Sequence, residues 1–242
     1  MNKLRLAVIS DIHGNLEALS AVLADVAAKG IEEIICLGDL VNYGPNPNEI
    51  VGILKNRGVP CVQGNHDLAV TLSLSDDQVR VGLGRDPGVE IGSYRWTCRA
   101  LDLSNKVFLR ELPRQLTLSI GPGKIFAFHA SPWSLTHYPS PEQLTVIAEM
   151  AEERESAGVV LLGHTHVPRA ESIGDVLLCN PGSVGRPKDG DNSATYGILD
   201  WDDHPSFQVI RIAYDVQRVV LRTLDCGLPP ELAFALLEAR EI

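Results

Sequence analysis

The sequence contains no apolar run long enough to form a membrane span. It has 242 residues, and no segment approaches the ~18–20 consecutive apolar residues that a membrane helix requires. The apolar run that starts at Leu4 stops at Ser10, which is too short for a secretory signal peptide, and no small-residue cleavage pattern follows it. We therefore expect no membrane partner and a cytoplasmic location.

Paired cysteines and positive charge are also scarce. The five cysteines are odd in number and lack CxxC spacing, which favours buried free thiols in a reducing compartment. Lys and Arg total 21 against 31 Asp and Glu, so the formal net charge is −10. An acidic surface argues against duplex nucleic acid as a partner. A small phosphorylated substrate is still compatible, because bound metal ions can reverse the charge locally.

One pattern recurs along the chain: a short apolar run followed by a polar loop that contains glycine or a small residue. Such runs predict buried strands, and a sheet of buried strands needs helices on its faces. Because each loop follows its strand, the loops should converge on one rim of the fold. The segments are LRLAVISDIHG (4–14), EEIICLGDL (32–40), VPCVQGNHD (59–67), KIFAFHAS (124–131), AGVVLLGHTH (157–166) and DVLLCNPGS (175–183).

Residues 70–120 depart from this pattern. They contain a turn-rich stretch at 82–88 and predicted helices near 91–102 and 104–111. No linker, repeat or low-complexity tract divides the chain. We therefore expect residues 1–242 to form one domain, with 70–120 as a partly helical segment near the active site that selects the substrate.

Side chains that can bind metal ions gather in the predicted loops, which hold five of the seven histidines. Each motif alone has an ordinary explanation, such as a helix cap or a turn, but five strand ends in succession indicate a metal site. Carboxylates and imidazoles without a thiolate suit Mn²⁺, Fe²⁺ or Zn²⁺. The candidates are too many for one ion and suit two ions that share a carboxylate. They are Asp11, His13, Asp39, Asn65, His66, His129, His164 and His166.

These loops resemble the signature motifs of the calcineurin-like metallophosphoesterase superfamily. The resemblance covers almost the whole chain and includes features of a small bacterial branch of phosphodiesterases and dinucleoside-tetraphosphatase-like proteins. It implies an α/β fold, a four-layer αββα sandwich whose two central sheets are flanked by helices, with a metal site at the carboxyl ends of the strands. The motifs are DIHGN (11–15), GDLV (38–41), GNHD (64–67), FHAS (128–131), GHTHVP (163–168) and, for the branch, NPGSVGRP (180–187).

Carried over residue by residue, the resemblance implies two divalent metal ions. Mn²⁺ is the expected metal, with Fe²⁺, Zn²⁺, Ni²⁺ or Co²⁺ as alternatives. Asp39 would bridge the ions as a catalytic residue, and His66 would contact the substrate or protonate the leaving group. The ligands would be Asp11, His13 and His166 for the first ion and Asn65, His129 and His164 for the second, and Asn65 and His66 would also bind the substrate. The NPGSVGRP loop has two interpretations of its own: Asn180, Ser183 and above all Arg186 bind a substrate phosphate, or the loop is only a tight turn.

Two residues depart from the family's protein phosphatases, which carry Asp and Arg where this chain has Asn42 and Tyr43. The missing Arg argues against a phosphoprotein substrate, and Asn42 is expected to accept a hydrogen bond from His66. We predict hydrolysis of a phosphate ester by a two-metal-activated hydroxide, with a phosphodiester or nucleotide favoured over a phosphomonoester. The alternative is an inactive scaffold of the same fold that binds protein partners, although such a scaffold should have lost ligands.

Overall fold

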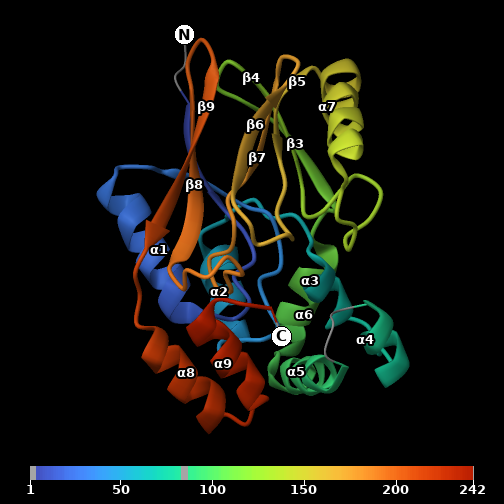
Figure 1. Cartoon of the computed structure of the whole chain (residues 1–242), viewed down its shortest axis with the longest axis vertical. Coiled ribbons are helices and arrows are strands. Elements are labelled where there is room, and N and C mark those ends of the chain that lie inside the picture. Colours follow the sequence, from blue (N-terminus) through green and yellow to red (C-terminus); the bar gives the residue numbers. More distant parts are fainter. Residues whose placement is uncertain (1–3, 83–86, 242) are drawn as a thin grey trace.

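A computed structural model describes residues 4–82 and 87–241 of the chain. Within these residues two β-sheets lie face to face, and helices cover their outer faces (Figure 1). The first sheet has the order β2 (Glu33–Cys36), β1 (Leu4–Ile9), β8 (Ala194–Trp201), β9 (Pro205–Ile212). The second has the order β3 (Gln115–Ile120), β4 (Gly123–Phe128), β5 (Ala157–Leu161), β7 (Val176–Asn180), β6 (Arg169–Ile173).

Alternation of side chains along the strands creates the layers. On β1, Leu6 and Val8 pack between the two sheets, whereas Ala7 and Ile9 pack under the helices. On β4, Ala127 likewise faces the opposite sheet, whereas Phe126 and Phe128 face a helix on the outer side. Strands that are apolar on both faces therefore require a helical layer on each outer side. This arrangement confirms the four-layer αββα sandwich.

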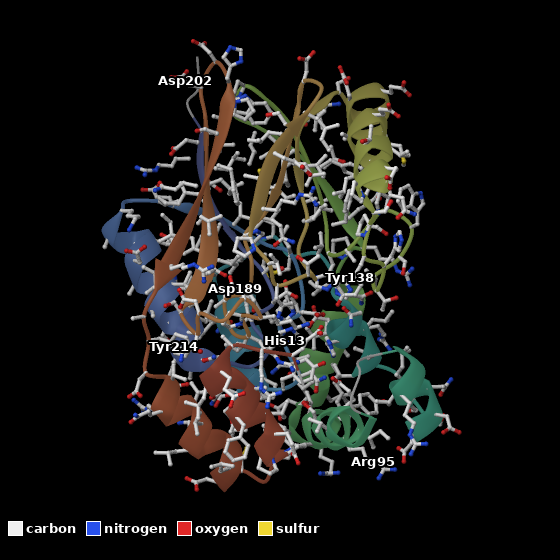
Figure 2. The ribbon with its side chains drawn as sticks, viewed as in Figure 1. His13, Arg95, Tyr138, Asp189, Asp202 and Tyr214 are labelled. Carbon is white, nitrogen blue, oxygen red and sulfur yellow. The ribbon has the colours of Figure 1, made fainter. Side chains whose placement is uncertain are left out.

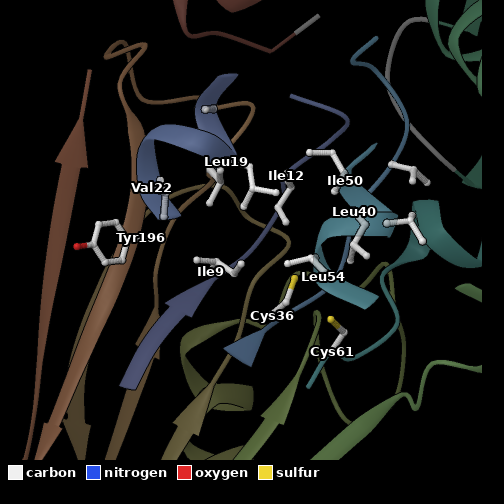
Figure 3. Close-up of a cluster of buried hydrophobic side chains, with 14 of the residues drawn as sticks. Ile9, Ile12, Leu19, Val22, Cys36, Leu40, Ile50, Leu54, Cys61 and Tyr196 are labelled. Atoms are coloured by element: carbon white, nitrogen blue, oxygen red, sulfur yellow. The ribbon is translucent and has the colours of Figure 1, made fainter. Parts of the chain in front are cut away.

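Three helices form the outer layers. Helix α1 (Leu16–Ala28) begins where the Asn15 side chain accepts a hydrogen bond from the Ala18 amide at 3.1 Å, and it lies with α2 (Pro47–Asn56) over the first sheet. Figure 3 shows Ile9, Leu19 and Val22 within this buried cluster. Helix α7 (Pro141–Glu155) covers the second sheet.

The remaining described helices gather at one end of the molecule, below the sheets in Figure 1. None of the helices in the described part of the chain is both long and apolar enough to cross a membrane. These helices are α3 (Asn65–Ala69), α4 (Asp76–Gly82), α5 (Pro87–Ala100), α6 (Leu103–Glu111), α8 (Val216–Asp225) and α9 (Pro230–Glu238).

The structure confirms the predicted helices near 91–102 and 104–111 as α5 and α6. The predicted strand that starts at Val59 is wrong, because only Cys61 pairs, through an isolated bridge to Cys36. Pro60 has no N–H to donate, and the chain turns into the next loop soon afterwards. The predicted turn at 82–88 includes residues 83–86, which lie outside the described residues.

The strand directions explain where the loops meet. Strand β1 is parallel to β2, and β4, β5 and β7 are parallel to one another. Parallel neighbours end at the same edge of a sheet, so the loops that follow them leave from one end of each sheet. The two ends face the same helical end of the molecule (Figure 1), and the predicted site residues lie between them.

Candidate metal and phosphoester site

The structure brings together all eight side chains that the sequence singled out. They lie in the loops after β1, β2, β4 and β5 and at the start of α3, and each is at most 7% exposed. Figure 2 places His13 where the sheets meet the helices of the lower end. The ligand atoms form three overlapping groups, each within 4.8 Å: Asp11, His13 and His166; His13, Asp39 and His66; Asp39, His129 and His164.

The first group surrounds one oxygen of Asp11. Its Oδ1 lies 3.2 Å from His166 Nε2 and 3.8 Å from His13 Nε2, and these two ring nitrogens are 3.2 Å apart. Asp11 Oδ1 is buried and has no hydrogen-bond partner among the described residues. The other oxygen, Oδ2, accepts hydrogen bonds from Ser10 Oγ and the His164 amide. The carboxylate is thus held on one side and open on the other.

Asp39 is arranged in the same way and joins the groups. Its Oδ1 accepts a hydrogen bond from the His66 amide at 2.9 Å. Its Oδ2 lies 3.2 Å from His129 Nε2 and 3.8 Å from His13 Nε2. His129 Nε2 is also 3.0 Å from Asn65 Oδ1, so the Asn65 amide lies beside the group of Asp39, His129 and His164. Asp39 Oδ2 therefore faces His13 on one side and His129 on the other.

Backbone carbonyls fix the orientation of three imidazoles. The Nδ1 atoms of His13, His129 and His166 donate to the carbonyl oxygens of Val41, Leu37 and Arg186. A proton held on Nδ1 leaves the Nε2 lone pair free to bind a metal. All three Nε2 atoms face carboxylate oxygens, as described above. The inward-facing lone pairs, the open Asp11 oxygen and the absence of a thiolate from the group fit two divalent ions.

The electrostatics of the site favour metal-binding protonation states for the two carboxyls and for all of the imidazoles except His129. Burial opposes ionisation of Asp11 and Asp39, but the neighbouring histidines hold the pKa of both carboxyls below its usual range. Burial lowers the pKa of His13, and it lowers that of His164 to about 3. Against burial, Asp39 raises the pKa of His129 to about 9. A metal ion at this position would take the place of that proton.

The loops that carry the ligands have unusual backbone conformations. Asp11, His13, Asp39, His164 and His166 all have φ between 47° and 66°, a region that non-glycine residues seldom adopt. Strain of this kind persists where the surrounding structure requires it and is common at functional sites.

Glycines bring two of these loops close together. A Cβ atom at Gly64 would lie 2.0 Å from Asp39 Oδ1 and 2.3 Å from the Asp39 amide nitrogen. A side chain at this position cannot be accommodated without moving Asp39. Gly64 is therefore required by the close approach of the loop that contains Asp39.

The environment of His66 corrects one expectation. Asn42 does not accept a hydrogen bond from His66: its Nδ2 donates to His66 Nδ1 at 2.8 Å. The Asn42 Oδ1 atom is already used, because it accepts from Ser93 Oγ at 2.6 Å and Thr97 Oγ1 at 3.3 Å. Neutral His66 then carries its proton on Nε2, and burial lowers its pKa to about 4.

Sequence reasoning missed the role of Asp67. Its carboxylate accepts hydrogen bonds from the backbone amides of Asp39, Leu40 and Gly64 at 2.8–3.0 Å. It therefore ties the loop of Asp39 to the loop that begins α3. Burial and the Asp39 charge raise the pKa of Asp67 to about 7, whereas the three amide donors favour the carboxylate. Its place three residues after a loop glycine and within the first turn of a helix was the available signal.

Arg186 lies beside the site, on the ring of Tyr43. The guanidinium carbon is 3.8 Å from the ring centroid, and that ring lies 4.9 Å from His13 and 4.8 Å from His66. The Tyr43 hydroxyl donates to Glu90 Oε1 at 2.7 Å. Tyr43, at the position where an arginine is expected in the protein phosphatases, therefore supports an arginine from a different loop.

The other polar residues of the Arg186 loop hold the structure together. Asn180 Nδ2 donates to the Gly163 carbonyl oxygen at 2.7 Å. Ser183 Oγ donates to the Asp11 carbonyl oxygen at 2.7 Å and accepts from the Arg186 amide at 2.8 Å. These bonds connect the Arg186 loop to the loop that contains Asp11 and to the loop that begins at Gly163. The tight-turn explanation therefore describes Asn180 and Ser183, while Arg186 remains a candidate for substrate binding.

Comparison with known proteins shows the family to which the sequence and the fold are similar. The sequence profile of the calcineurin-like phosphoesterase superfamily domain matches residues 4–204. An uncharacterized protein of Methanocaldococcus jannaschii is 33% identical over 99% of this chain and 100% of its own length. The Escherichia coli phosphodiesterase YfcE is 30% identical over 82% of this chain and 89% of its own length. The crystal structure of a metallophosphoesterase from Sphaerobacter thermophilus superimposes with a TM-score of 0.79 at 29% identity, covering 98% of this chain and 100% of that one.

Proposed function

The chain belongs to the calcineurin-like phosphoesterase superfamily and is a metal-dependent phosphoester hydrolase, and from this premise we propose that two divalent metal ions act in its site. The supporting observation is that a single oxygen of Asp39 faces the imidazoles of both His13 and His129. Asp39 is the proposed shared ligand. The other proposed ligands are Asp11, His13 and His166 for the first ion and Asn65, His129 and His164 for the second. Mn²⁺ is the proposed metal; Fe²⁺, Zn²⁺, Ni²⁺ and Co²⁺ suit similar ligands.

When bound, the ions would activate a water molecule for attack on phosphorus and neutralise charge on the phosphoryl oxygens. Asp39 holds both halves of the site at a fixed separation, because its second oxygen is bound to the α3 amide of His66. Arg186 contributes a fixed positive charge on the same side as Tyr43. We propose that it binds a phosphoryl oxygen, as Asn65 and His66 also do.

We further propose that His66 acts as a hydrogen-bond donor and does not transfer its proton. Asn42 Nδ2 donates to His66 Nδ1, so a second proton on the ring would lose this bond. A neutral imidazole that gave up its Nε2 proton would become an imidazolate, which is strongly unfavourable. His66 therefore stabilises charge on a phosphoryl oxygen through its Nε2–H.

For the substrate, we propose a small phosphodiester or nucleotide over a phosphomonoester. One support is the phosphodiesterase relative in Escherichia coli. The other is Tyr43, which stands where an arginine is expected in the family's protein phosphatases. The complete ligand set argues against an inactive scaffold. Hydrolysis of bis-nitrophenyl phosphate, nitrophenyl phosphate and cyclic nucleotides with added Mn²⁺ tests this proposal. Faster turnover of the diester is expected; exclusive monoester hydrolysis would refute the preference.

A further inference from the structure

A cavity of about 250 Å³ opens beside His164, one of the ligands proposed for the second ion. His164 belongs to both, because it is one of the residues that line the cavity and one of its ring nitrogens lies within 4.8 Å of the candidate ligand atoms of Asp39 and His129. A substituent on a phosphorus atom bound at the site therefore has an adjoining space. By contrast, a larger cavity of about 560 Å³ between Val70 and α5 is lined by none of the proposed site residues.

The wall of the cavity offers mainly apolar surface. Leu144, Leu162 and Leu178 line it and are themselves at most 5% exposed. Of the polar residues in the wall, Asn180 donates through Nδ2 to Thr165 Oγ1 at 3.1 Å and to a carbonyl oxygen, and the charged Arg169 pairs with Glu171 at 2.7 Å. Because the Arg169 charge already has a partner and the rest of the wall is mainly apolar, a charged occupant would lose its hydration without a matching gain, so the wall suits an uncharged group.

The size and the surrounding rings narrow the occupant further. A volume of about 250 Å³ lies below the roughly 300–1,000 Å³ of pockets for drug-sized ligands, so it admits one compact group. His137 and His164 are among the residues that line the cavity. The Tyr138 ring lies 4.4 Å from His164, and the Trp133 ring lies 6.1 Å from His137. Neighbouring rings of this kind favour a flat aromatic group over an aliphatic one.

We propose that this cavity binds a flat, uncharged ring carried by the substrate, either an aryl group or a nucleobase. The inference rests on the proposed phosphoester site and deepens it by naming the substrate's organic part. It places recognition of that part in residues 130–144 and 162–180, which include the start of α7 and the strands β6 and β7. Residues of α5 instead orient Asn42, because Ser93 and Thr97 donate hydrogen bonds to its Oδ1 atom.

The test measures binding of non-hydrolysable phosphonates to Mn-loaded protein by calorimetry. Phenylphosphonate and methylphosphonate share the metal-binding group and differ only in the ring. Wild-type protein should bind the phenyl compound about tenfold to a hundredfold more tightly, the value of burying one ring. A 5′-phosphonate of adenosine forms a second arm, and tighter binding of either ring compound identifies an aryl group or a nucleobase as the source.

Two matched variants locate the effect. Val167 lines the cavity and is 49% exposed, whereas Val146 on α7 is 43% exposed and does not line it. Val167→Trp should fill the cavity and reduce the preference for the ring to near one, and Val146→Trp should keep it. Elemental analysis should show the wild-type metal content in both variants.

The outcomes separate the two proposals. Binding of both ring compounds by wild-type protein no tighter than that of methylphosphonate, or an undiminished preference in Val167→Trp, would overturn the ring site and leave the phosphoester site intact. Absence of binding by every phosphonate, with no ester hydrolysed, would overturn the proposed function and the ring site with it.

Discussion

At the scale of single residues, the site depends on how each carboxylate divides its two oxygens. Asp11 and Asp39 each have one oxygen held by hydrogen bonds and one turned towards imidazole nitrogens. The held oxygen fixes the angle at which the other is presented. This division makes the roles of the carboxylates testable by substitutions that keep their shape.

Asp39→Asn should reduce activity more than Asn65→Ala. The first change removes the charge that we assign to both ions, whereas the second removes one neutral ligand of a single ion. We expect Asp39→Asn to lose both ions and Asn65→Ala to lose mainly one, measured by elemental analysis alongside turnover. Near-normal turnover in Asp39→Asn would show that Asp39 is not shared.

His66→Ala should slow nitrophenyl esters and alkyl esters to a similar extent. A hydrogen bond to a phosphoryl oxygen stabilises the transition state whatever the leaving group. A proton donor would instead matter far more for the alkyl esters, because nitrophenolate leaves without a proton and general acid catalysis is worth ~10²–10⁴-fold. Rate constants for a series of leaving groups distinguish the two roles.

Asn42→Asp provides the matched control for His66. A carboxylate at this position would accept a hydrogen bond from Nδ1–H and favour the imidazolium form, which can donate a proton from Nε2. Alkyl esters should then gain relative to nitrophenyl esters in this variant. If wild-type protein already shows the larger alkyl-ester loss on His66→Ala, the hydrogen-bond role is wrong.

At the scale of elements, the sequence predicted what is local and missed what is not. A short apolar run followed by glycine and a polar residue indicates a strand end, so the ligands could be found within each segment. The orientation of Asn42 depends on Ser93 and Thr97, which lie 51 and 55 residues away. No local pattern contains that information. Likewise β3 and helix α7 were not predicted, because alternating or charged segments give weaker signals than buried runs.

Gly64→Ala should damage the metal site, whereas Gly52→Ala should not. The first places a Cβ against Asp39, and the second, in the middle of α2, meets no atom within 4 Å. We expect Gly64→Ala to lose roughly 1–3 kcal/mol of stability together with metal affinity. Gly52→Ala should gain about 0.5–1 kcal/mol, measured by denaturant unfolding with elemental analysis. Equal metal content in both variants would contradict the role assigned to the close approach.

At the scale of the whole molecule, the site joins the two sheets. The loops of the first sheet supply Asp11, His13 and Asp39, and those of the second supply His129, His164 and His166. The proposed ligands meet only because the sheets pack face to face across the core that includes Val8 and Ala127. We infer that the chain acts as one domain, and that metal binding and folding are coupled.

Added Mn²⁺ should therefore raise the unfolding temperature. A ligand that binds only the folded state adds about 2.7 kcal/mol at a concentration of 100 times its Kd. The shift should disappear on addition of a chelator and should be much smaller in Asp39→Asn. An unfolding temperature that does not depend on Mn²⁺ would separate metal binding from the packing of the two sheets.

The central claim is that two ions share Asp39, and the stoichiometry of the active protein tests it most directly. Metal-free protein would be titrated with Mn²⁺ while bound metal, by elemental analysis, and diester hydrolysis are measured on the same samples. We predict two ions per chain at saturation, with activity following occupancy of the second ion. Full activity at one ion per chain or fewer would contradict the account.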